Sequence, residues 1–135
     1  MPALMFGTIK NKLGETLDYT FHEGSANCRD LLIIGHGVTG NKDRPFVLAL
    51  ADAVSASGIN VIRFSFAGNG DSDGEFRDCT ISKEVDDLQA VLSVVGEKNY
   101  RAIYAGHSMG GAVGVLTAAK DSRIKFLISL AGMVS

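Results

Sequence analysis

Four short, largely apolar runs recur along the chain. They are Leu31–Ile34, Asn60–Phe66, Ala102–Ala105 and Phe126–Leu130. Runs of this length and composition are typical of strands that lie buried in a parallel sheet with both faces covered. We therefore expect each run to form a strand of one sheet.

Segments with helical periodicity separate these runs. The clearest follows Thr80, a residue that can cap a helix, and its apolar residues recur at every third or fourth position. The expected helices begin at Pro45 and close near Gly58, begin at Thr80 and end at Gly96, and run from Met109 to Ala119. This alternation predicts an α/β fold with helices on both faces of a mostly parallel sheet. Ligands of such folds bind beyond the carboxyl ends of the strands.

The start of the chain has a different pattern. From Met5 to His22 apolar and polar residues roughly alternate, and Lys12–Glu15 interrupts them with turn chemistry, which predicts an antiparallel N-terminal hairpin. No repeat, low-complexity tract or linker interrupts the rest. We expect the 135 residues to form one domain or part of one.

Composition and charge indicate which classes of binding partner to expect. The chain is 46% hydrophobic and 21% charged, as in ordinary globular proteins, and its net charge is −2. Because its basic residues are scattered, nucleic acid is not expected as a partner. No apolar stretch approaches the roughly 20 residues that span a bilayer, and Met1–Met5 lacks the pattern of a leader. We expect a cytoplasmic protein with no membrane span.

The segment Gly106-His107-Ser108-Met109-Gly110 has the spacing of a nucleophile elbow. A predicted strand enters it and a predicted helix leaves it, as the motif requires. The sharp turn would lift the Ser108 hydroxyl outward, and Gly106 and Gly110 would lack side chains where strand and helix approach each other. The start of the helix would also favour negative charge near the serine. We therefore expect Ser108 to be a catalytic nucleophile.

A second loop of small residues, 35–42, follows the first predicted central strand and contains His36 and Gly37. Acyl transfer requires two hydrogen-bond donors for the carbonyl oxygen as it becomes negative. One is expected from the backbone of the residue after the nucleophile, Met109, and the other from this loop, at Val38.

Several cofactor motifs are nearly present, but each lacks a required feature. The glycines of the 35–42 loop have P-loop spacing without the lysine that should follow directly, and Gly68–Gly74 has one residue too many for a dinucleotide fingerprint. A calcium loop from Asp71 would place Phe76 at its obligatory glycine. Cys28 and Cys79 lack the spacing of a metal or disulfide site. We expect no cofactor and no metal.

With these motifs in place, the chain resembles the α/β-hydrolase superfamily, and within it the cinnamoyl esterases, monoacylglycerol lipases and serine peptidase-like hydrolases. The resemblance rests on residues 36–42, 64–74 and 106–110 and on the helix that carries Glu84 and Asp87. It implies an α/β-hydrolase fold and a triad in the order serine, acid, histidine. Because family members are about twice as long, the resemblance implies that residues 1–135 are the N-terminal half of one domain, with the C-terminal strands, triad acid and histidine missing.

None of the three histidines is expected to act as the base. The elbow directs the His107 side chain away from Ser108, and the resemblance suggests that His36 organises the 35–42 loop. His22 falls in the predicted hairpin and is expected to be a half-exposed strand residue.

Two hypotheses follow. In the first, the chain belongs to a serine hydrolase that cleaves small-molecule carboxylic esters through an acyl-enzyme on Ser108, with a peptidase or thioesterase of the same fold as alternatives. In the second, it is a non-catalytic half that acts as a binding or assembly module. Unpaired backbone at the predicted strand Phe126–Leu130 would then favour self-association or pairing with a complementing C-terminal half.

Overall fold

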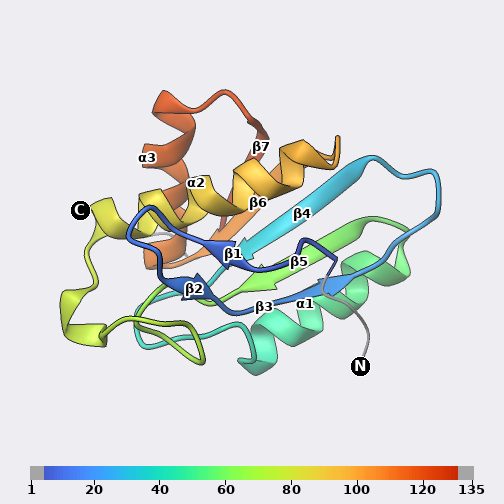
Figure 1. The fold of residues 1–135 in the computed structure, drawn as a ribbon. Helices are drawn as coiled ribbons and strands as arrows, with labels where there is room; N and C mark the ends of the chain where they lie inside the picture. Colours follow the sequence, from blue (N-terminus) through green and yellow to red (C-terminus); the bar gives the residue numbers. More distant parts are fainter. Residues whose placement is uncertain (1–4, 131–135) are drawn as a thin grey trace.

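The computed structural model describes residues 5–130, which form a five-stranded sheet, a small hairpin and three α-helices (Figure 1). The sheet order is β3-β5-β4-β6-β7, with β4 to β7 parallel and β3 antiparallel to β5. The strands are β3 (Tyr19–His22), β4 (Asp30–Gly35), β5 (Asn60–Phe64), β6 (Arg101–His107) and β7 (Ile124–Leu130). The four predicted central strands and the mostly parallel sheet are confirmed.

The start of the chain forms three strands rather than two. The predicted hairpin is present as β1 (Ile9–Lys10) and β2 (Thr16–Leu17), and its turn is held by Asn11 Oδ1, which accepts hydrogen bonds from the backbone nitrogens of Leu13 and Glu15. β3 then leaves the hairpin and joins the main sheet beside β5. Alternation of apolar and polar residues identifies a strand but does not identify its partner.

The three helices connect successive parallel strands. They are α1 (Pro45–Ala56), α2 (Ile81–Glu97) and α3 (Met109–Lys120), and a short 3₁₀ helix, η1 (Phe76–Asp78), precedes α2. Thr80 caps α2 as predicted, because its Oγ1 accepts a hydrogen bond from the Lys83 nitrogen at 3.1 Å. Gly96 does not end that helix: the left-handed residue is Asn99, with φ 63°, a conformation that asparagine tolerates.

Helices cover both faces of the sheet, as the alternation predicts. Along β4, Leu31 and Ile33 pack into the larger core with α2, α3 and the hairpin, whereas Leu32 and Ile34 pack against α1. Figure 1 shows α1 on one side of the sheet and α2 and α3 on the other. Because β4 is buried on both sides, it is apolar at every central position.

The outer strand β7 is the exception to this burial. Phe126, Leu127 and Ile128 expose 69%, 36% and 44% of their surface, and Val115 and Leu116 of the neighbouring helix α3 are also exposed. Within residues 5–130, β7 pairs with β6 alone. An apolar strand with one free edge is a surface on which another chain segment can pair.

Candidate active site

Ser108 occupies the sharp turn between β6 and α3, at the carboxyl end of a central strand. Its backbone angles are φ 55° and ψ −117°, a conformation that is unfavourable for a residue with a side chain. Two backbone hydrogen bonds of 2.9 Å hold the turn, one from the Ser108 nitrogen to the Leu130 oxygen and one from the Gly111 nitrogen to the Ser108 oxygen. The strand, turn and helix lie in the order that the pattern predicts.

The glycines around Ser108 permit backbone contact between strand, helix and loop. A Cβ on Gly106 would collide with the backbone of Gly110, and a Cβ on Gly110 would lie 2.6 Å from the His36 oxygen and 2.8 Å from the Gly35 oxygen. The start of α3 therefore packs directly on the end of β4. A side chain at either glycine would separate the two segments that flank Ser108.

The 35–42 loop lies against the same turn. A Cβ on Gly37 would be 3.2 Å from Ser108 Cβ and 3.3 Å from the His107 oxygen. Val38, the next residue, exposes 55% of its surface, and Met109 is half-buried. The fold therefore brings together the loop and the helix start to which the sequence assigns the two oxyanion donors.

His36 is buried, with 3% of its surface exposed, and both of its ring nitrogens have partners. The Phe66 nitrogen donates to Nε2 at 3.0 Å, and Nδ1 lies 2.7 Å from the Gly37 oxygen. This pattern assigns the proton to Nδ1. Burial lowers the pKa of His36; the Gly37 carbonyl opposes that effect and the charge of Arg44 reinforces it. A neutral ring bonded at both nitrogens joins two loops and has no free nitrogen for Ser108.

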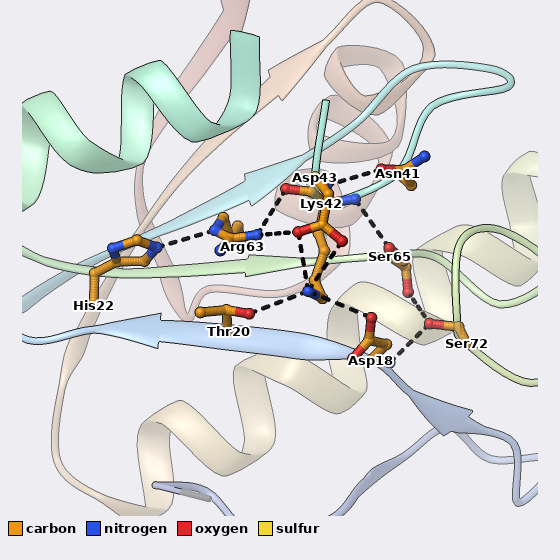
Figure 2. A network of polar contacts seen from close by, with 9 residues as sticks. All are labelled: Asp18, Thr20, His22, Asn41, Lys42, Asp43, Arg63, Ser65 and Ser72. Carbon is orange, nitrogen blue, oxygen red and sulfur yellow. Dashed lines mark hydrogen bonds and ion pairs between the residues drawn. The ribbon is translucent and has the colours of Figure 1, made fainter. Parts of the chain in front are cut away.

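The far end of the same loop is anchored by Lys42, which lies at the centre of a polar network (Figure 2). Its backbone nitrogen donates to Ser65 Oγ at 2.9 Å. Its buried ammonium group donates to Thr20 Oγ1 at 3.2 Å and lies 3.5 Å from an Asp18 carboxylate oxygen. These contacts fasten the loop to β3 and to the end of β5.

Arg63 of β5 completes this network (Figure 2). Its Nη1 donates to the Lys42 backbone oxygen at 3.1 Å and pairs with the Asp43 carboxylate, and its Nε donates to His22 Nε2 at 3.0 Å. Burial alone would raise the pKa of Asp43, but Arg63 and Lys42 together lower it. The sequence pattern did not predict this anchor, because the partners of Lys42 lie on distant strands.

His107 lies beside Ser108 but contacts another residue. Its ring centroid is 5.1 Å from that of Phe46 in α1, and both rings line a pocket of about 340 Å³ together with Ser108 and the 35–42 loop. Within residues 5–130, no side chain forms a hydrogen bond with Ser108 Oγ. The structure thus brings neither His36 nor His107 into position as a base.

A second pocket of about 280 Å³ adjoins the first at Val38 and reaches Met109 and Glu84. The sequence pattern placed Glu84 at the capped start of its helix and in the family resemblance, and it predicted no role for this residue in the site. No sequence motif marks Glu84 as a site residue. Only the packing of α2 in the folded protein shows which pocket its side chain lines.

Nothing in residues 5–130 forms a metal site, since no group of three or more His, Cys, Asp or Glu side chains lies close enough to hold an ion. Asp73, which falls in the calcium-like loop that starts at Asp71, accepts a hydrogen bond from the Thr16 nitrogen at 2.9 Å. No helix in this part of the chain is long and apolar enough to cross a membrane. Most of the Met1–Met5 segment lies outside the described residues.

Comparison with known proteins agrees with this geometry. Residues 26–135 match the family model for serine aminopeptidase S33 hydrolases. The chain is 29% identical over 124 residues to an uncharacterised 31.7 kDa protein from the traX-finO intergenic region of Escherichia coli, covering 88% of this chain and 43% of that protein. It therefore spans less than half the length of this relative.

Solved structures give the same result. Est1E from Butyrivibrio proteoclasticus, determined with ferulic acid bound, is 29% identical with a TM-score of 0.79, over 87% of this chain and 48% of Est1E. Alpha/beta hydrolase domain-containing protein 10 from mouse is 28% identical with a TM-score of 0.73, over 85% and 44%. Each match covers more than four fifths of this chain and less than half of the other protein. The chain belongs to the serine aminopeptidase S33 family of α/β hydrolases.

Proposed function

We propose that this chain provides the nucleophile and the oxyanion donors of a serine hydrolase that acts on carboxylic esters. The observation that carries the proposal is the strained backbone of Ser108 at the carboxyl end of β6, in contact with Gly37 of the 35–42 loop. Strain of this kind is found where a nucleophile must be lifted from a turn. Est1E was determined with ferulic acid bound, and a carboxylic acid is the product that hydrolysis of an ester releases, which supports an ester as the substrate.

In this proposal the Ser108 Oγ attacks the ester carbonyl carbon while a base removes its proton. The carbonyl oxygen becomes negative and accepts hydrogen bonds from the backbone nitrogens of Met109 and Val38. Collapse of the intermediate breaks the carbon–oxygen bond, the alcohol leaves with the proton, and the acyl group remains on Ser108. Water then attacks the acyl-enzyme by the same route and releases the acid. No cofactor takes part in these steps.

The base in this proposal lies outside residues 5–130. His36 is bonded at both nitrogens, His107 packs on Phe46, and His22 accepts a hydrogen bond from Arg63 on the far side of the network. The chain spans less than half of the Escherichia coli relative and of Est1E, so we assign the triad acid and histidine to a segment equivalent to the part that it does not cover. Without them, turnover would fall by up to about a millionfold.

A fluorophosphonate probe, which reacts with activated serines, tests this function. A full-length polypeptide, in which this chain is followed by the C-terminal half of the hydrolase domain, is expected to be labelled at Ser108. The isolated 135-residue chain is expected to be labelled far more slowly. The control is Ser108→Ala, in which labelling should disappear. An unlabelled Ser108 in the full-length polypeptide, under conditions that label known serine esterases, would overturn the proposal. A panel of matched esters, amides and thioesters separates the esterase from its peptidase and thioesterase alternatives.

A second candidate is assembly, favoured by the exposed apolar residues of β7 and α3. Phe126 and Ile128 lie on a strand that is paired on one side only within residues 5–130, and a second copy of the chain could pair there. We expect concentration-dependent association in light scattering, reduced by Phe126→Lys. A monomer at high protein concentration would contradict self-association, and capture of a separate C-terminal half would point to complementation instead.

A further inference from the structure

The second pocket differs in chemistry from the one beside Ser108. It is bounded by apolar side chains of Val38, Phe76, Ile81 and Met109, with Glu84 of α2 and Arg77 of η1 also in its lining. The two pockets share Val38, one of the two residues that carry the proposed oxyanion donors; the other, Met109, lines the second pocket, and Ser108 lines the first. A substrate with its carbonyl at that point therefore has space on either side, for two different arms.

Glu84 is the one acid among the residues that line these two pockets. It is half-buried in the first turn of α2. Within residues 5–130 its carboxyl group forms no hydrogen bond and no ion pair, and the ammonium group of the adjacent Lys83 pairs with Glu15 at 2.9 Å. Burial raises the pKa of Glu84 to about 7, and the nearby Asp87 carboxylate adds to the increase.

The neighbouring acids of α2, Asp86 and Asp87, have structural roles. Asp87 is fully buried, and its oxygens accept hydrogen bonds from Asn11 Nδ2 and from the Ala67 nitrogen, both at 2.8 Å. Asp86 pairs with Lys12 at 3.3 Å. Glu84 is less buried than Asp87 and, unlike Asp86 and Asp87, lines the second pocket and bonds no other part of the described fold. Within residues 5–130 no buried polar side-chain atom lacks a partner, so the unpaired oxygens of Glu84 are accessible from solvent and can accept a bond from a ligand in this pocket.

We propose that Glu84 is a specificity-determining residue whose carboxyl group forms a hydrogen bond with a hydroxyl on the substrate arm that enters the second pocket. This inference rests on the proposed function, because it places the ester carbonyl between the two pockets. A hydroxyl fits in either protonation state, since a carboxylate accepts from it and a carboxylic acid donates to it. The exposed Arg77 in the same lining disfavours an ammonium group.

A pair of small aromatic probes, phenol and toluene, tests the inference without requiring turnover. They match in size and differ in one hydroxyl. We expect nuclear magnetic resonance titration of the chain to show phenol binding at the methyl groups of Ile81 and Met109 about fivefold more tightly than toluene. Glu84→Leu should bring this preference to about one. Glu84→Gln, which keeps hydrogen-bonding groups, should retain most of it.

Glu97→Gln is the matched control, because Glu97 is an exposed acid at the end of the same helix. It should leave the phenol preference unchanged. An equal affinity of the wild-type chain for the two probes would overturn the inference, as would a preference that survives Glu84→Leu. Thermal unfolding of both Glu84 variants checks that they are folded, and if the leucine variant is not, the comparison of phenol with toluene on the wild-type chain still tests the inference.

The fluorophosphonate experiment separates this inference from the proposed function. Normal labelling of Ser108 together with loss of the phenol preference in Glu84→Leu supports both. Absence of labelling with an intact preference in the wild-type chain would refute the nucleophile assignment and leave a hydroxyl-binding pocket. Normal labelling with no preference for phenol would refute the role of Glu84 alone.

Discussion

The Nε2 atom of His36 lies 3.0 Å from the backbone nitrogen of Phe66 and accepts its hydrogen bond in a buried position. This contact joins the loop after β4 to the chain after β5, although the two residues are 30 positions apart. It positions the loop that carries Gly37 and Val38 beside Ser108. The site therefore depends on a histidine that takes no direct part in the proposed chemistry.

Replacing His36 by phenylalanine should destabilise the protein and impair the site. The Phe66 nitrogen would remain buried without an acceptor, which costs about 1–3 kcal/mol of unfolding free energy. Chemical denaturation measures this loss. Labelling of Ser108 by a fluorophosphonate, in a polypeptide that also carries the C-terminal half, should slow as well. His36→Asn, which restores an acceptor, should recover part of the stability; equal losses in both variants would contradict the role assigned to Nε2.

Acid should weaken the folded state through His36. Its pKa is lowered in the folded protein, so the unfolded chain binds the proton more readily. The stability contributed by neutral His36 is complete above its unfolded pKa, about 6.5, and is lost as the pH falls toward its lower folded value. Denaturation at a series of pH values should therefore show a smaller acid-dependent loss in His36→Phe than in the wild-type protein.

The stability that Glu84 contributes should depend on pH in the opposite direction. Its folded pKa of about 7 exceeds the ordinary value of 4.5, so its contribution is complete below 4.5 and is lost as the pH rises through about 7. Glu84→Gln should become more stable relative to the wild-type protein as the pH increases across that range. A constant difference between the two would show that Glu84 titrates normally.

The strained backbone at Ser108, which the proposed function requires, is expected to lower the stability of the folded protein. A positive φ is less favourable for a residue with a side chain than for glycine. The free energy of unfolding of Ser108→Gly should therefore be about 1 kcal/mol higher than that of Ser108→Ala. Both variants lack the hydroxyl, so the comparison isolates the backbone term. Thermal or chemical denaturation of the pair measures it, and equal stability would mean that the turn relaxes in solution.

Two glycine substitutions should have opposite effects. Gly110→Ala would place a Cβ 2.6 Å from the His36 oxygen, and we expect a loss of about 1–3 kcal/mol together with loss of labelling at Ser108. Gly96→Ala, in the last turn of α2, meets no atom within 4 Å and should gain up to about 1 kcal/mol by favouring the helix. Similar effects at both positions would show that backbone contact at Gly110 is not limiting.

The sequence by itself determined the elements of this protein and the serine turn. Periods of two and 3.6 residues identify strands and helices because each depends on which side chains share a face, and the glycines around Ser108 mark a turn that only small residues permit. Local information of this kind also placed the 35–42 loop after a strand, where α/β folds bind ligands.

Only the tertiary structure decided which distant residues support that turn. His36 meets Phe66, Lys42 meets Thr20 and Ser65, and Glu84 lines the pocket beside Met109, because parallel strands joined by crossover helices bring their carboxyl ends together from separate parts of the chain. The sequence did not predict which strand β3 pairs with, for the same reason. A residue's own neighbours set its secondary structure, whereas its contacts across the sheet depend on strand order, which no local pattern encodes.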